Sequence, residues 1–506
     1  MNGDPYLSME AGVELLAGRG VAGSLAELAA LVELVRGEGL ALKLLAAYLH
    51  EAHQGAAAGF CPAELGEIAP GGEVAAVLGA FERLLAASPG GSGEQAAAHG
   101  RVFDQLQEAC EDQPATLEGL LPLYQAIRHG CQAGRYHQAL HQVYIGRILR
   151  GSHLHGFFST RQLGAASAEL AALAAFFVRP FSEVTDQLPE EDRVFLCNQA
   201  GFYLSAIGRP RAALEPTRVG LGAAAAAGDW NNAAGIAGNL AELHLLLGNV
   251  GAALDVSETA VELADRSEDL FRRLTCRAIW AEVFHRGGNL ADALALFKEA
   301  EALQTEWQSH LPMLYSVAGC RFCDVLLIPA ERTAAAWGRF SSAEYEACGE
   351  AERRLELMFS WLSDEDSLLD RGLVHLGRGR LRLFQAILSG HPELAAEWAG
   401  ADLEQAVALL EASGHRDFEA GGLLARAWLR AVGGDGDGAW SDLDAAHTIA
   451  FEGEMALYLT DIALYRGRLF AIPAALREAR ERIEHYGFFR RLAELGDAEA
   501  ALAGRA

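Results

Sequence analysis

Most of the chain consists of stretches in which apolar residues recur at three- and four-residue spacing, separated by short breaks that contain glycine. This spacing places the apolar side chains of a stretch on one side of a helix. Alternating runs of β-branched residues, which are typical of strands, are missing, whereas Ala, Leu, Glu and Arg dominate and favour helices. The pattern therefore predicts an all-α protein.

One phrase recurs with a period of forty residues: "YLSAIGRPRAAL" (203–214), "LHLLLGNVGAAL" (243–254) and "VFHRGGNLADAL" (283–294). Each copy has a glycine and, five residues later, an alanine: Gly208, Gly248, Gly288 and Ala213, Ala253, Ala293. Glycine can adopt the left-handed conformation that a tight turn between helices needs, and alanine allows two helices to cross closely. Self-similarity at a fixed period predicts stacked helix pairs that bury their apolar stripes against their neighbours.

The third copy, "TCRAIWAEVFHRGGNLADALALFKEAEAL" (275–303), resembles the tetratricopeptide repeat. The large, small and aromatic positions of that family fall on Trp280, Ala281, Phe284, Gly288, Ala293, Phe297 and Ala300. Looser copies occur at 130–140, 383–414 and 425–450. The resemblance implies a superhelical solenoid over residues 115–490, with a concave groove that binds a protein or a peptide. It assigns to that groove or its edge Asn198, Phe202, Asn239, Glu242, Leu246, Glu282, His285 and Arg286. The alternative for each of them is an ordinary solvated position.

Residues 7–55 resemble a different family, the bacterial STAND ATPases, in the helical segment that ends their nucleotide-binding domain. The family's "G-x-P-L-A-L-x-L-L" turn reads "GEGLALKLL" at 37–45, with Gly39 in place of the proline that abuts the adenine. A P-loop needs a lysine between a glycine and a hydroxyl residue. Neither of the two lysines, Lys43 and Lys298, has these neighbours, so we expect no self-sufficient ATPase. The resemblance implies the sensing or scaffolding arm of a STAND-like regulatory or defence system, working with a separate nucleotide-binding or effector protein.

These patterns divide the chain into four parts. Residues 1–60 form the STAND-like helical segment, 61–114 a linker and helical spacer, 115–490 the repeats and 491–506 a C-terminal tail. The best linker candidate is "SPGGSGE" at 88–94, because Gly, Pro and Ser interrupt helices. For the first three parts, the pattern therefore predicts a small helical N-terminal module joined to a long repeat array.

The composition limits the classes of partner that we expect for this chain. The formal net charge is −27, from 41 basic and 68 acidic residues, and this balance argues against nucleic acid as the main partner. It favours a basic or apolar ligand. No run of apolar residues is long enough for a membrane span, and the N-terminus lacks a basic signal-peptide region, so we expect a cytoplasmic protein.

Three clusters could carry chemistry. His137 and His141 lie at the i, i+4 spacing of a metal-binding helix, which leaves a metal site or a cryptic enzyme as the alternative function. Cys320 and Cys323 form a lone C-x-x-C that suits a helix core, and the aspartates at 435–444 do not fit a calcium loop. No motif of nucleophilic catalysis is present. We therefore expect a non-enzymatic protein without a cofactor, and we expect the histidines to be polar residues on a solvated helix.

Overall fold

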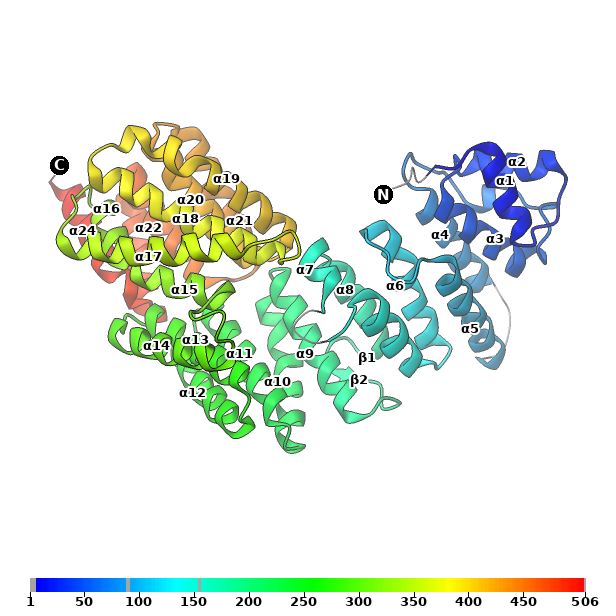
Figure 1. The fold of residues 1–506 in the computed structure, drawn as a ribbon, viewed down its shortest axis with the longest axis horizontal. Helices are drawn as coiled ribbons and strands as arrows, with labels where there is room; N and C mark the ends of the chain where they lie inside the picture. Colours follow the sequence, from blue (N-terminus) through cyan, green and yellow to red (C-terminus); the bar gives the residue numbers. More distant parts are fainter. Residues whose placement is uncertain (1–5, 88–91, 153–155, 505–506) are drawn as a thin grey trace. The chain divides into compact units, whose positions relative to one another are not determined.

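The computed structural model describes residues 6–87, 92–152 and 156–504, whose regular secondary structure is almost entirely helical (Figure 1). Within these ranges the two strands, β1 (Phe177–Arg179) and β2 (Glu183–Val184), form one short hairpin. The prediction of an all-α protein is confirmed. Residues 88–91 of the predicted linker lie outside the described ranges. The chain forms two compact units, 1–178 with 185–188 and 179–184 with 189–506. The predicted domain boundaries stay predictions.

The first unit begins with three short helices, α1 (Met9–Gly18), α2 (Leu25–Leu34) and α3 (Gly39–His53). The turn before α3 follows the predicted "GEG" sequence, with Gly37 at a φ of +74°. The Glu38 side chain accepts a hydrogen bond from the N–H of Ala41 and thereby caps α3. The unit continues with η1 (Pro62–Glu64), α4 (Glu73–Ala87), α5 (Ser92–Ala109), α6 (Leu117–Gln132), η2 (Gln138–Ile148), α7 (Phe158–Leu163), α8 (Ala166–Leu173) and η3 (Ala174–Phe176).

The second unit begins with three helix pairs that correspond to the forty-residue phrase. They are α9 (Glu190–Ala206) with α10 (Pro210–Ala226), α11 (Trp230–Leu246) with α12 (Val250–Ser267), and α13 (Leu270–Arg286) with α14 (Leu290–Trp307). The turn glycines have φ values of +82°, +80° and +85°, and the three crossing alanines are fully buried. The predicted turn and crossing positions are therefore confirmed, because glycine adopts this backbone conformation without strain.

Further helices follow in the second unit and complete its core. They are α15 (Ser316–Leu326), α16 (Ile328–Ala335), α17 (Ser342–Trp361), α18 (Leu368–Ser389), η4 (Pro392–Leu394), α19 (Ala395–Ser413), α20 (Arg416–Val432), α21 (Gly436–Glu452), α22 (Ala456–Phe470), α23 (Pro473–Tyr486), η5 (Phe489–Arg491) and α24 (Leu492–Ala503). Most of their apolar faces share one large cluster around the rings of Phe384 and Trp428, whereas α23 and α24 pack with α22 in a smaller, separate cluster. Cys320 and Cys323 belong to it as small buried residues, as their helical spacing predicts.

The C-terminal helices of this unit pack against the turns of its first three repeats. A Cβ atom added at Gly208 would lie 3.3 Å from Cβ of Arg416, and one at Gly248 would lie 2.6 Å from Cδ1 of Tyr486. At Gly288 the nearest atom, 3.0 Å away, is Cβ of Phe489. The turn glycines therefore have a second role that the repeat pattern does not reveal. They leave room for the start of α20, the end of α23 and η5.

Candidate functional site: the inner face of the repeat unit

Within the second unit, the first helices of the repeats (α9, α11 and α13) face α20, α22 and η5, and we call the side chains between them the inner face. The rings of Phe202 and His415 meet edge to face at 5.7 Å, and α11 packs on α22. Arg490 of η5 lies 2.9 Å from Nε2 of His285 on α13. All eight residues assigned to the groove lie on α9, α11 or α13. Their part in ligand binding stays a prediction.

Two asparagines of neighbouring repeats form an amide pair on this face. Nδ2 of Asn239 donates to Oδ1 of Asn198 over 3.0 Å, and both side chains are half-buried. Phe202, one turn further along α9, keeps 39% of its surface exposed, and Leu246 at the end of α11 is half-buried. An amide both donates and accepts hydrogen bonds, as a peptide bond does, so the pair can exchange its mutual bond for bonds to an extended backbone.

Next to the amide pair, Glu242 forms an ion pair with Arg321 of α15 over 2.6 Å. Their side chains keep 34% and 18% of their surface exposed. Burial opposes the charge of Arg321, but Glu242 and Glu282 outweigh it and raise the pKa of the guanidinium. The guanidinium of Arg321 therefore stays charged, and both side chains keep part of their surface exposed.

The other predicted positions on α13 are more enclosed. Glu282 binds Arg286 at 2.5 Å and Nδ1 of His285 at 3.1 Å, and both Glu282 and His285 are buried. Burial by itself raises the pKa of Glu282, but Arg286 and His285 outweigh it and hold the pKa well below its usual range. Burial and the neighbouring Arg490 lower the pKa of His285 to about 4, so this histidine is neutral at pH 7. Glu282 and His285 lie beneath the C-terminal segment, and Arg286 at their edge is half-buried.

The opposite side of the inner face contributes residues that spacing alone did not indicate. Asp417 on α20 is half-buried, and its Oδ1 is buried without a hydrogen-bond partner among the described residues. Burial, with a smaller contribution from Glu242, raises the pKa of Asp417 to about 7, although the N–H of Phe418 and the charge of Arg321 act against this shift. The phenol of Tyr458 on α22 lies near it, since a Cβ on Gly421, one turn along α20, would be 3.5 Å from the Tyr458 oxygen.

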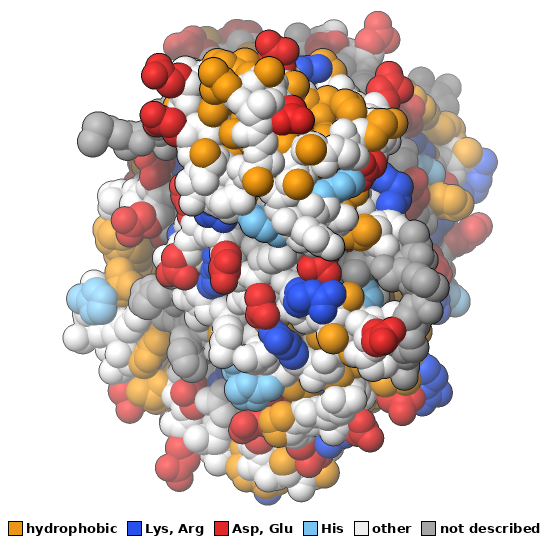
Figure 2. Space-filling model, turned by 90° about the vertical axis from the view of Figure 1, so that its right-hand side faces the viewer, with side chains coloured by type: hydrophobic (Ala, Val, Ile, Leu, Met, Phe, Trp, Pro, Cys, Tyr) orange, Lys and Arg blue, Asp and Glu red, His pale blue; other side chains and the backbone are white. Residues whose placement is uncertain are grey.

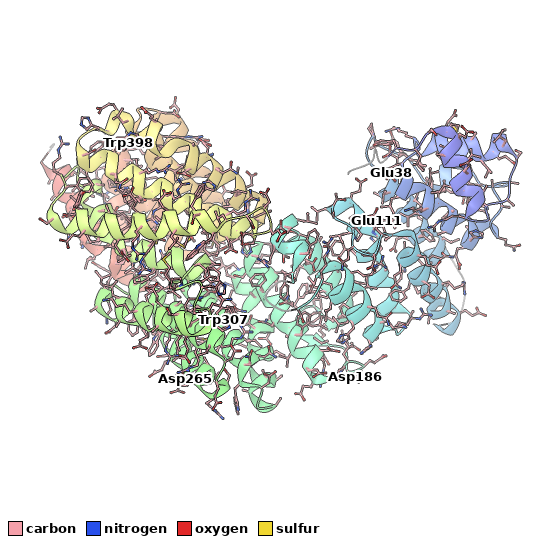
Figure 3. All side chains as sticks on the ribbon, viewed as in Figure 1. Glu38, Glu111, Asp186, Asp265, Trp307 and Trp398 are labelled. Atoms are coloured by element: carbon pink, nitrogen blue, oxygen red, sulfur yellow. The ribbon has the colours of Figure 1, made fainter. Side chains whose placement is uncertain are left out.

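A buried ion cluster fixes η5 below this face. Glu331 of α16 binds Arg490 and Arg491, each over 2.9 Å, and Arg491 also binds Asp461 of α22 over 2.6 Å. Burial raises the pKa of Glu331, but the arginines outweigh it and hold the pKa well below the usual range. Asp265 on α12, which is labelled in Figure 3, forms a separate ion pair with Arg277 of α13 over 2.9 Å.

The structure also places the residues of the alternative sites. The rings of His137 and His141 lie 4.4 Å apart, but no group of three or more metal-ligating side chains exists among the described residues. Burial raises the thiol pKa of both Cys320 and Cys323, which disfavours the reactive thiolate. Asp435 accepts a hydrogen bond from Gly438 and caps α21, so its loop is a turn between helices.

No protein-family model matches the chain, and no curated protein matches its sequence. Among solved structures, it is similar to the Rap conjugation gene regulator of plasmid pLS20 in complex with the Phr* peptide, with 11% identity and a TM-score of 0.45 over 83% of this chain and 96% of that one. A Rap protein complexed with competence and sporulation factor shares 14% identity with a TM-score of 0.32, over 86% of this chain and 97% of the other.

A STAND protein with a tetratricopeptide repeat sensor from Pyrococcus horikoshii shares 13% identity with a TM-score of 0.33. The match covers 98% of this chain and 62% of that one. At these identities the three structures assign no function to the chain. Separately, none of the described helices is both long and apolar enough to cross a membrane.

Proposed function

We propose that the chain is a non-enzymatic protein-interaction scaffold whose inner face binds a peptide or an extended protein segment. The observation that carries this proposal is the amide pair Asn198–Asn239, which lies beside the exposed ring of Phe202. An extended peptide presents donors and acceptors along its backbone and needs apolar contacts for alternate side chains. The inner face offers both kinds of contact from consecutive repeats.

The binding experiment uses the full chain and a positional-scanning library of short N-acetylated peptide amides. We expect the wild-type protein to retain a subset of peptides, and we expect Asn239→Ala to bind them roughly three- to tenfold more weakly, the range that one net hydrogen bond supplies. Asn232→Ala is the matched control, because Asn232 lies exposed on the same helix and bonds Asp229. Equal losses in both variants, or no retained peptide, would contradict the proposal.

We further propose that the chain is the sensing or scaffolding arm of a STAND-like regulatory or defence system. The support is the resemblance of residues 7–55 together with an apolar surface on α1 and α2, where Met9 is 40% and Leu25 74% exposed. Hydrophobic side chains gather at the upper end of the face in Figure 2, where these helices lie. A separate nucleotide-binding or effector protein would cover this surface.

Size-exclusion chromatography with the nucleotide-binding protein encoded nearest to this chain tests the assignment. We expect the two proteins to elute together and Leu25→Glu to separate them, because a charge on an apolar contact is costly to bury. Val178→Glu changes an apolar residue of similar exposure, 67%, outside residues 1–60 and serves as the control. Separate elution of the wild-type proteins would refute this placement.

A further inference from the structure

Asp417 is a carboxylate of the inner face that has no arginine or lysine of its own as an ion-pair partner among the described residues. Its buried Oδ1 accepts no hydrogen bond from any described residue. A buried acceptor without a partner costs on the order of 1–3 kcal/mol, and more when it is charged. Because the folded chain leaves this oxygen without a hydrogen bond at that cost in free energy, a bound ligand is a candidate for the missing partner.

The groups around Asp417 do not supply the missing cation. Arg321 is engaged by Glu242 over 2.6 Å, and Arg286 by Glu282 over 2.5 Å. Arg416, the preceding residue, pairs with Glu419 over 2.8 Å. His415 is neutral at pH 7, because burial lowers its pKa to about 4.

The surroundings suit a cation that comes from outside the chain. Glu242 keeps 34% of its side chain exposed, and its interaction with Asp417 is repulsive, so a positive charge close to both carboxylates would relieve this repulsion. The phenol of Tyr458, which interacts with Asp417 and Arg286 and lies next to Gly421 of α20, brings an aromatic side chain to this region. Aromatic rings attract guanidinium and ammonium groups through their π-electrons.

We propose that the inner face contains a subsite for one basic side chain, arginine or lysine, of the bound peptide. Asp417 is its direct ion-pair partner, Glu242 is the second carboxylate and Tyr458 forms the aromatic wall. The subsite rests on the proposed function, and it specifies which kind of peptide side chain the inner face would select. It also agrees with the net charge of −27, which steers basic peptides toward the chain.

The test repeats the library selection with the full chain and compares wild type, Asp417→Asn and Asp437→Asn. Asp437 is an exposed carboxylate in the first turn of α21, so its variant removes the same charge from a surface site. We expect wild type and Asp437→Asn to enrich arginine or lysine at one peptide position. Asp417→Asn should still retain peptides without that enrichment.

The pH dependence provides a second readout. Asp417 is mostly protonated at pH 6 and mostly ionised at pH 8, whereas His415 stays neutral over this range. A peptide that needs the ionised carboxylate should bind about tenfold more tightly at pH 8 than at pH 6, and Asp417→Asn should lose this difference. Circular dichroism of each variant verifies that the helices persist.

The outcomes separate the two proposals. Peptides retained without any preference for basic residues would overturn the subsite and leave the scaffold function standing. The same basic enrichment in Asp417→Asn would also overturn it. No retained peptide at any pH would overturn the scaffold function and the subsite together.

Discussion

At the scale of single residues, two carboxylates of the inner face differ in how their charge is balanced. Glu282 is bound by Arg286 and His285 and has a pKa well below the usual range, whereas Asp417 lacks such a cation and has a pKa of about 7. Glu282 could be assigned to this surface from repeat spacing. Asp417 could not, because it lies between the looser repeat copies at 383–414 and 425–450, and its charged neighbours come from α11 and α15, which are distant in sequence.

Asp417→Asn should stabilise the folded protein at pH 8 and leave its stability nearly unchanged at pH 4. The pKa rises from 3.8 to about 7 on folding, so the folded state binds this proton more tightly and stability falls as the pH rises from about 4 to about 7. The asparagine removes that loss. We expect a gain of roughly 1–3 kcal/mol at pH 8, given about 1.4 kcal/mol per unit of pKa and the residual exposure of the side chain.

Urea unfolding of wild type and Asp417→Asn at pH 4 and pH 8 measures this gain. Asp437→Asn should show no comparable difference between the two pH values. A gain that is equal at both pH values would mean that ionisation of Asp417 is not its source.

At the scale of elements, the helix-pair turn is the part that sequence predicts best. Glycine and alanine at fixed spacing define both the turn and the crossing of each pair, and this information is local. The contact between each turn and a C-terminal segment is not local. At Gly248, for example, the neighbour Tyr486 lies at the end of α23, and no repeat signature indicates that the two meet.

Gly248→Ala should destabilise the protein by roughly 2–4 kcal/mol. The alanine would have to adopt a φ of +80°, and its Cβ would lie 2.6 Å from Cδ1 of Tyr486 and 2.7 Å from Cβ of Ala456. Gly251→Ala is the control in the first turn of α12, where an added Cβ meets nothing within 4 Å. It should be neutral or stabilising by up to about 1 kcal/mol.

Chemical denaturation of the two glycine variants measures the free energy of unfolding of each. If Gly248→Ala were as stable as Gly251→Ala, the close contact between the Gly248 turn and Tyr486 would be contradicted.

At the scale of the second unit, the repeats are closed by contacts between residues more than 150 positions apart. Arg491 of η5 reaches Glu331 of α16, and Arg211 of α10 binds Glu454 over 2.6 Å. A solenoid predicted from repeats alone has an open concave side. In each contact one partner lies in a short irregular segment, η5 or the turn before α22, which carries no periodic signal, and the closure encloses Glu282 and His285.

Glu331→Gln should destabilise the folded protein by about 3–5 kcal/mol, because it leaves the buried Arg490 and Arg491 without their shared carboxylate. Glu454→Gln breaks an exposed pair with Arg211 and should cost less than about 1 kcal/mol. Urea unfolding measures both variants. If both variants lost the same small amount of unfolding free energy, the buried ion cluster would not stabilise the packing of η5 against the repeats.

Amide hydrogen exchange of the full chain, with and without a peptide selected from the library, tests most directly that the inner face is the binding surface. We predict that the peptide slows exchange in α9, α11, α13, α20 and α22, which contribute the amide pair, the ion pairs, Asp417 and Tyr458. Slower exchange confined to the outer helices α10 and α12, or to the first unit, would contradict it.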